Sequence, residues 1–102
     1  MTPVEISVTQ GERSRSVRAE DGVFARAMTP VGEALAVSST EDQGILEGEE
    51  ERRGTLRTNF PPGGWHEQSQ VFENDPLSFT RRYSDLDAGL IKIQASYLPD
   101  LV

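Results

Sequence analysis

The segment from Leu77 to Leu98 constrains the fold more than any other part of the chain. It contains two strand-like runs, which are separated by a short polar turn at residues 87–89. In the second run, alternate residues are apolar and share one face: Ile91, Ile93, Ala95 and Tyr97. Alternation with a period of two is typical of a half-buried antiparallel strand. This segment therefore predicts a β-hairpin and an all-β fold.

Similar short runs along the rest of the chain predict further strands. They cover Val4–Thr9, Ser14–Ala19, Val23–Met28, Glu33–Ser38, Thr55–Phe60 and Trp65–Glu73. Turn-forming residues separate them, and Asp21-Gly22 predicts a tight hairpin between the second and third runs. Pro61-Pro62-Gly63-Gly64 predicts another turn, with Phe60-Pro61 and Pro61-Pro62 as candidates for a cis peptide bond. The pattern predicts a small antiparallel β-sandwich or partly open β-barrel of seven or eight strands in one domain spanning residues 1–102.

Two regions are ambiguous in the sequence. Glu33–Ser38 contains helix-favouring Ala, Leu and Glu, but it is short and precedes a strand-favouring stretch, so we interpret it as a strand. In residues 40–53, Thr40 and Gln43 could form a capping box at the start of a short helix. Two glycines inside that segment would each cost about 1 kcal/mol in a helix. Residues 40–53 therefore predict either one short helix or an acidic loop.

Composition excludes several classes of function. The 102-residue chain contains no cysteine, which excludes disulfides and thiolate metal sites. Its formal net charge of −7 argues against binding to nucleic acid or to an anionic membrane surface. It lacks the run of about 18 apolar residues that a membrane-spanning helix needs. With no basic-then-apolar signal sequence at the N-terminus, we expect a cytoplasmic or particle-associated protein. Nine arginines against one lysine indicate GC-rich coding and a bacterial or phage source.

The segment from Phe60 to Gln68 carries the most unusual residues, including the only Trp and the only His. Pro62, Gly63 and Trp65 could present an aromatic contact to a partner protein, because Trp is enriched in interface hot spots. The simpler interpretation is that Trp65 packs in the core and that His66 points into water, since adjacent strand residues face opposite ways.

Catalytic and metal-binding signatures are weak. His66 could act as a general base, but no nucleophile motif accompanies it. The segment Asp85-Leu86-Asp87-Ala88-Gly89 resembles the opening of a calcium loop. It lacks the third acidic ligand and the twelfth-position Glu, and a hairpin turn explains its composition. We expect no metal and no cofactor.

A ligand-binding barrel is a further possibility raised by the sequence. Phe72, Phe79, Arg81 and Tyr83 could line its interior if the strands enclose a cavity. Arg81 and Arg82 are adjacent on one strand, so one of them projects to each face and could stack on an aromatic ring.

One three-residue resemblance accompanies this hypothesis. Gly63-Gly64-Trp65 is similar to the Gly-x-Trp pattern of lipocalins, and the final hairpin resembles the closing strands of their barrels. In lipocalins the Trp lies near the start of the barrel, whereas here it lies past the middle of a shorter chain. The resemblance therefore carries no functional residue to this sequence.

The sequence leaves three classes of function open. The first is a non-enzymatic structural or interaction module, a small subunit of a larger assembly such as a bacterial or phage particle, with a protein partner or self-association. The second is a small-ligand-binding β-barrel, and the third is an enzyme that uses His66. We favour the first, because the polar run at Ser14–Ala19 could lie at an open sheet edge and the Trp65 loop could contact a partner.

Overall fold

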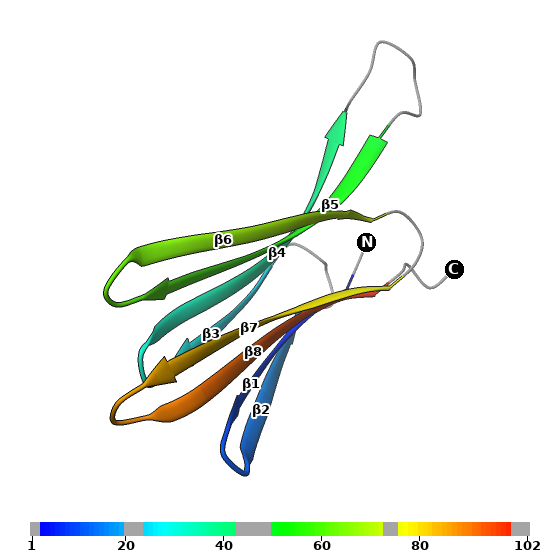
Figure 1. The fold of residues 1–102 in the computed structure, drawn as a ribbon. Helices are drawn as coiled ribbons and strands as arrows, with labels where there is room; N and C mark the ends of the chain where they lie inside the picture. Colours follow the sequence, from blue (N-terminus) through cyan, green and yellow to red (C-terminus); the bar gives the residue numbers. More distant parts are fainter. Residues whose placement is uncertain (1–2, 20–23, 43–49, 73–75, 99–102) are drawn as a thin grey trace.

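The computed structural model describes residues 3–19, 24–42, 50–72 and 76–98, and these residues form an all-β structure (Figure 1). The eight strands are β1 (Val4–Gln10), β2 (Arg13–Ala19), β3 (Phe24–Thr29), β4 (Gly32–Asp42), β5 (Glu50–Phe60), β6 (Gly64–Phe72), β7 (Leu77–Asp85) and β8 (Gly89–Tyr97). They form two four-stranded antiparallel sheets. Sheet A has the order β2-β1-β8-β7 and sheet B the order β3-β4-β5-β6. The two sheets pack face to face, which confirms the predicted small β-sandwich.

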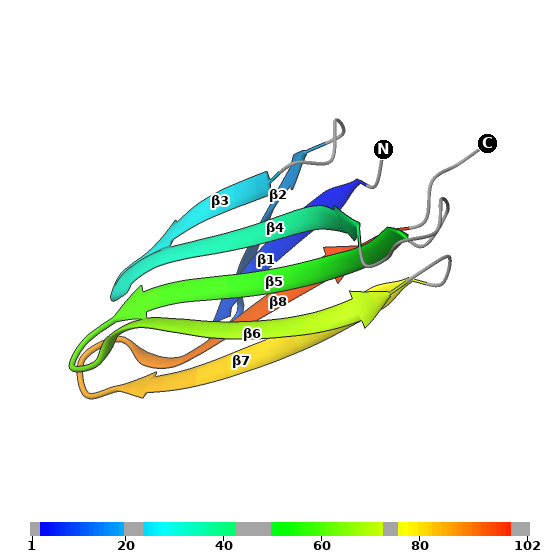
Figure 2. The same ribbon diagram turned by 90° about the horizontal axis from the view of Figure 1, so that it is seen from above.

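The chain crosses between the sheets at two places, after β2 and after β6. Within each sheet, most neighbouring strands are also neighbours in the sequence. The exception is β8, which returns to pair with β1 and places Tyr97 opposite Val4 (Figure 2). The four hairpin turns, β1–β2, β3–β4, β5–β6 and β7–β8, lie at one end of the sandwich (Figure 1). Sheet A thus joins the first two and last two strands of the chain.

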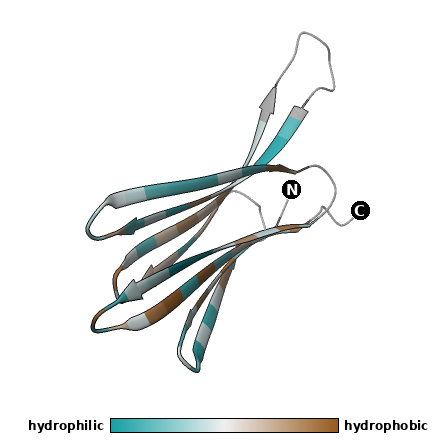
Figure 3. Ribbon diagram, viewed as in Figure 1, coloured by the Kyte–Doolittle hydropathy of each residue, from teal (hydrophilic) through white to brown (hydrophobic). Residues whose placement is uncertain are grey.

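The core lies between the sheets and is built from alternate residues of the strands. Figure 3 shows the alternation as hydrophobic bands, which are strongest on β8. Sheet A contributes Val4, Ile6, Val8, Phe79, Ile91, Ile93, Ala95 and Tyr97, and sheet B contributes Ala25, Ala27, Ala34, Ala36, Leu56, Phe60 and Phe72. Four of the five buried alanines lie on β3 and β4, whereas the buried aromatic rings lie on β5 to β8. Small side chains therefore fill one side of the sandwich and large rings fill the other.

Tyr97 is the largest fully buried side chain among the described residues. Its ring lies with a centroid distance of 5.7 Å from the rings of both Phe72 and Phe79. Its hydroxyl donates a hydrogen bond of 2.6 Å to the backbone carbonyl of Thr55 on β5. Burial raises the pKa of Tyr97 above its ordinary value. This residue joins sheet A to sheet B through both apolar and polar contacts.

The structure corrects one pairing that the sequence predicts. The third strand pairs with β4 and the second with β1, so β2 and β3 belong to different sheets. The hairpin expected at Asp21-Gly22 would have joined them, and those two turn residues lie outside the described part of the chain. Local turn preference was outweighed because the alternative pairing buries Ala25 and Ala27 against β1, while β2 buries none of its side chains.

The ambiguous regions are resolved where the structure describes them. Glu33–Ser38 lies within β4, so the interpretation as a strand is confirmed. Residues 40–42 end β4 and residues 50–53 begin β5, so neither the short helix nor the acidic loop forms in those positions. The rest of that region, residues 43–49, lies outside the described residues. Pro61-Pro62 is one of the two predicted candidates for a cis bond, and it is cis.

Candidate functional site

The outer face of sheet B consists of the side chains of β3 to β6 that point away from sheet A. They alternate with the buried residues of the same strands, and paired residues on neighbouring strands share a face. In one row across this face, Met28 lies opposite Glu33, Glu33 opposite Asn59, and Asn59 opposite Trp65. The face therefore brings together residues from four strands that are far apart in the sequence.

Trp65 lies on this outer face and is not part of the core. Its side chain is 50% exposed, and the guanidinium carbon of Arg57 lies 5.1 Å from the centroid of its ring. The expectation that Trp65 packs in the core is wrong. Its neighbour Gly64 pairs with buried Phe60, so the alternation of the strand turns Trp65 outward.

Pro62 and Gly63 lie in the exposed turn between β5 and β6, directly before the strand that carries Trp65. A Cβ atom added at Gly63 would meet nothing within 4 Å. The structure thus places all three residues of the predicted partner-binding loop at one hairpin, with open space around its tip.

Each described charged side chain on the outer face of sheet B has a partner of opposite sign. The pairs are Arg26–Glu33 at 2.5 Å, Arg53–Glu51 at 3.4 Å and Arg57–Glu67 at 3.5 Å. Exposed ion pairs of this kind contribute little to folding stability. Their effect is to cancel the charge of this face, within a chain whose formal net charge is −7.

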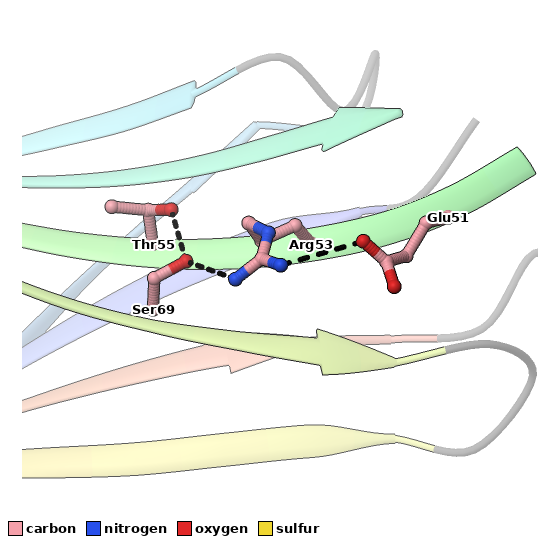
Figure 4. Close-up of polar contacts among 4 residues, drawn as sticks. All are labelled: Glu51, Arg53, Thr55 and Ser69. Carbon is pink, nitrogen blue, oxygen red and sulfur yellow. Dashed lines mark hydrogen bonds and ion pairs between the residues drawn. The ribbon is translucent and has the colours of Figure 1, made fainter. Parts of the chain in front are cut away.

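Polar contacts also connect β5 to β6 on this face (Figure 4). The Arg53 guanidinium, which contacts Glu51, donates a second hydrogen bond of 3.3 Å to the Ser69 hydroxyl. That hydroxyl lies 3.1 Å from the hydroxyl of Thr55. The polar groups of these four residues are therefore directed toward one another along the sheet surface.

A patch of apolar side chains occupies the β3–β4 side of the same face. Phe24 and Met28 are each 52% exposed, and Phe24 lies opposite Val37 in the strand register. Leu35 lies between them on β4 and is half-buried. These residues are not among the candidate site residues that the sequence indicates. The sequence does contain one signal, because Phe24 and Met28 alternate with Ala25 and Ala27. The two alanines are the residues buried on the β3–β4 side of the core, where the side chains are small.

The four residues predicted to line a ligand cavity are instead in contact with the core. Phe72 and Phe79 are buried. The Arg81 guanidinium donates a hydrogen bond to the Thr58 hydroxyl and lies 5.2 Å from the centroid of the Phe60 ring. Tyr83 packs on the same ring, with a centroid distance of 4.9 Å, and its hydroxyl donates to the carbonyl of Pro61. Arg81 therefore stacks on an aromatic ring, which is one of the roles that the sequence leaves open for it.

Two of the cavities formed by the described residues lie at the surface of the sandwich, and neither is lined by any of those four residues. The larger, of about 760 Å³, lies between the β1–β2 and β7–β8 turns and includes Gln10, Leu90 and Lys92. The smaller, of about 370 Å³, lies between β2 and β3 and includes Arg13, Arg15 and Met28. Both open at the hairpin end of the sandwich.

His66 and Asp85 have simple structural surroundings. His66 lies opposite Thr58 and its side chain is exposed, at the free edge of sheet B. The Asp85 carboxylate accepts hydrogen bonds from the backbone N–H groups of Asp87 and Ala88, at 3.0 and 2.8 Å, and so closes the β7–β8 turn. The described residues include no group of three or more metal-ligating side chains. They also include no helix that could span a membrane.

Comparison with known proteins identifies no relative: no family model matches the chain, and no curated protein or solved structure is similar to it.

Proposed function

We propose that this chain is a non-enzymatic interaction module, a small subunit of a larger protein assembly, which docks on another protein through the outer face of sheet B. The observation that carries the proposal is the exposed side chain of Trp65 on a face whose described charges are all paired. The bacterial or phage origin indicated by the arginine-rich composition is compatible with a particle as the assembly.

Paired charges reduce the free energy cost of docking. Removing an unpaired charge from water is expensive, whereas a charge with a partner already in place keeps that partner when the surface is covered. Arg57 contacts both Glu67 and the ring of Trp65, so these three side chains form one unit. A partner could therefore cover Trp65 without leaving an isolated charge beneath it.

The exposed apolar residues supply the attraction. Trp65, Phe24, Met28 and Val71 are each at least 44% exposed on this face. Aromatic residues, Met and Arg are enriched at protein interfaces, and such surfaces combine an apolar centre with a polar rim. The partner that fits is another protein subunit with a flat, largely uncharged contact surface.

Replacement of Trp65 by alanine tests the proposal. Native mass spectrometry of the freshly purified wild-type protein is expected to show a discrete oligomer or a stoichiometric complex with a second protein. The W65A variant should weaken that association about 30-fold, because interface hot spots cost about 2 kcal/mol or more when truncated. Its circular dichroism spectrum should remain that of the folded protein, since Trp65 lies outside the core.

Leu90→Ala is the matched control, because Leu90 is 55% exposed but belongs to sheet A. It should leave the association unchanged. A wild-type protein that is a bare monomer, or an association that W65A and L90A affect equally, would contradict docking through the outer face of sheet B.

A further inference from the structure

The second strand, β2, has one edge that no described strand covers. It pairs with β1 along its whole length and forms the end of sheet A. None of its seven side chains is buried, and its sequence, RSRSVRA, contains three arginines and no acidic residue. The unpaired N–H and C=O groups of an edge strand can accept a further strand from another chain.

The groove between β2 and β3 lies beside this free edge. It has a volume of about 370 Å³ and combines apolar contacts from Val8, Met28 and Pro30 with the side chains of Arg13 and Arg15. No acidic residue lines it. The groove is therefore basic, although the chain as a whole is acidic.

Arg13 and Arg15 face this groove and have no partner among the residues that the structure describes. In the strand register they lie opposite Gln10 and Val8, and Val8 is a core residue, so both arginines are on the inner side of β2. Within the described part of the chain, neither guanidinium makes an ion pair or a hydrogen bond. The three arginines on the outer face of sheet B, by contrast, are all paired.

We propose that β2 binds an acidic, extended peptide segment of a partner protein as an added strand. Arg13 and Arg15 are two residues apart, so their side chains are about 7 Å apart along the strand. A peptide strand with acidic residues at alternate positions places two carboxylates opposite them. The next inner residue of β2 is Val17, which is 39% exposed and would contact an apolar residue. In a strand added antiparallel to β2, the orientation of every strand pair in sheet A, the sequence pattern that fits is apolar-x-acidic-x-acidic.

Charge argues against a second copy of this chain as the occupant. Pairing of β2 with β2 from another copy would bring six arginines together, with no acidic residue on either strand. Like charges across an interface suppress association. The groove also lies at the opposite edge of the sandwich from β6, so the roles of the two arginines and of Trp65 can be tested separately, although Met28 belongs to both surfaces.

The test uses a labelled peptide of sequence TVTDTDT and the full-length protein, with binding measured by fluorescence anisotropy at low salt. We expect saturable binding that is at least 10-fold weaker in the double variant Arg13→Gln, Arg15→Gln. The control is Arg82→Gln, which removes an exposed arginine from the outer side of β7 and should change the affinity less than twofold. Thermal unfolding of each variant should match the wild type, because the replaced side chains are exposed.

Two altered peptides separate strand addition from simple charge attraction. A peptide methylated on those alternate backbone nitrogens that face β2 cannot donate hydrogen bonds to the ladder and should bind at least 10-fold more weakly. The isomer TVTTDDT, whose two acids face opposite ways in a strand, should bind several-fold more weakly. Equal affinity for the three peptides would overturn strand addition.

Loss of the arginine effect would also overturn the proposal. Absence of binding at 1 mM peptide, or equal binding by wild type and the double variant, would show that the groove does not recognise acidic strands. Binding of inorganic phosphate or of an oligonucleotide in place of the peptide would assign the arginines to phosphate ligands instead.

Discussion

The ring of Tyr97 lies directly against the backbone of Gly54 in the facing sheet. A Cβ atom at residue 54 would be only 2.7 Å from the Cε2 atom of the ring and 2.8 Å from Cδ2. Glycine therefore permits the largest buried ring to reach β5, where its hydroxyl finds the carbonyl of Thr55. Neither the contact nor the need for glycine is visible in the sequence around residue 54.

Gly54→Ala should destabilise the fold. Overpacking of a dense core usually costs about 1–3 kcal/mol, because neighbouring atoms must move. Urea unfolding followed by circular dichroism measures the change. Gly63→Ala is the control, since a Cβ atom there meets nothing within 4 Å. Equal stability of G54A and wild type would show that the Tyr97 ring can move aside without cost.

The titration of Tyr97 predicts how stability depends on pH. Burial raises its pKa in the folded state, whereas in the unfolded state the pKa is about 10. The stabilisation is complete below pH 10 and decreases as pH rises further, because only the unfolded state then loses the proton. Between pH 8 and 11, the free energy of unfolding should fall by about 1 kcal/mol through this residue.

Tyr97→Phe removes this titration and serves as the comparison. At pH 8 the variant should be less stable by about 1 kcal/mol, because the hydrogen bond to Thr55 is lost. The difference between the two proteins should narrow at pH 11. A difference that is the same at both pH values would contradict the assigned role of the phenol.

At the scale of the strands, β6 and β7 are the free edges on the aromatic side of the sandwich, and no backbone ladder joins them. Side chains of β7 make the connection to sheet B instead. Arg81 bonds Thr58 on β5, and Tyr83 bonds the carbonyl of Pro61 in the β5–β6 turn. These residues, which the sequence suggested as ligand contacts, hold two sheet edges in position.

Loss of these contacts should loosen β7 more than the centre of the molecule. In the double variant Arg81→Leu, Tyr83→Phe, amide hydrogen exchange in β7 should become about 10-fold faster, since edge elements open locally at lower cost. Exchange in β1 and β8 should be unchanged. Arg82→Leu, on the other side of the same strand, is the control. Equal acceleration in all strands would mean that the contacts stabilise the whole fold rather than its edge.

Considered as a whole, the molecule has two surfaces of different chemistry. The outer face of sheet B pairs its described charges and exposes Trp65 among other apolar residues. Along the β2 edge of sheet A, Arg13 and Arg15 have no ion-pair partner among the described residues and lie beside a groove. Because half-buried Ala19 is the only β2 residue among the described hydrophobics that pack against the core, the core constrains few of the residues that β2 carries. The two proposed contacts therefore use parts of the fold that the core leaves available.

Local patterns in the sequence were sufficient to predict the strands and the final hairpin. Alternation with a period of two indicates a strand wherever one face is clearly apolar, as on β8. The same pattern correctly separated the two faces of β7, so that Phe79, Arg81 and Tyr83 were expected together. The sequence also indicates Trp65 as a candidate for partner binding. The simpler interpretation of the same residue, that it packs in the core, is the one that the structure contradicts.

The tertiary structure alone decided which face of an ambiguous strand is buried. On β3 the alternatives were two alanines against Phe24 and Met28. On β6 they were Phe72 with several polar residues against Trp65 and Val71. Composition within one strand favours burial of the larger apolar residues. Burial depends instead on register with neighbouring strands and on the space between the sheets, which residues distant in the sequence determine. For that reason the exposed aromatic face and the arginine groove became visible only in the folded structure.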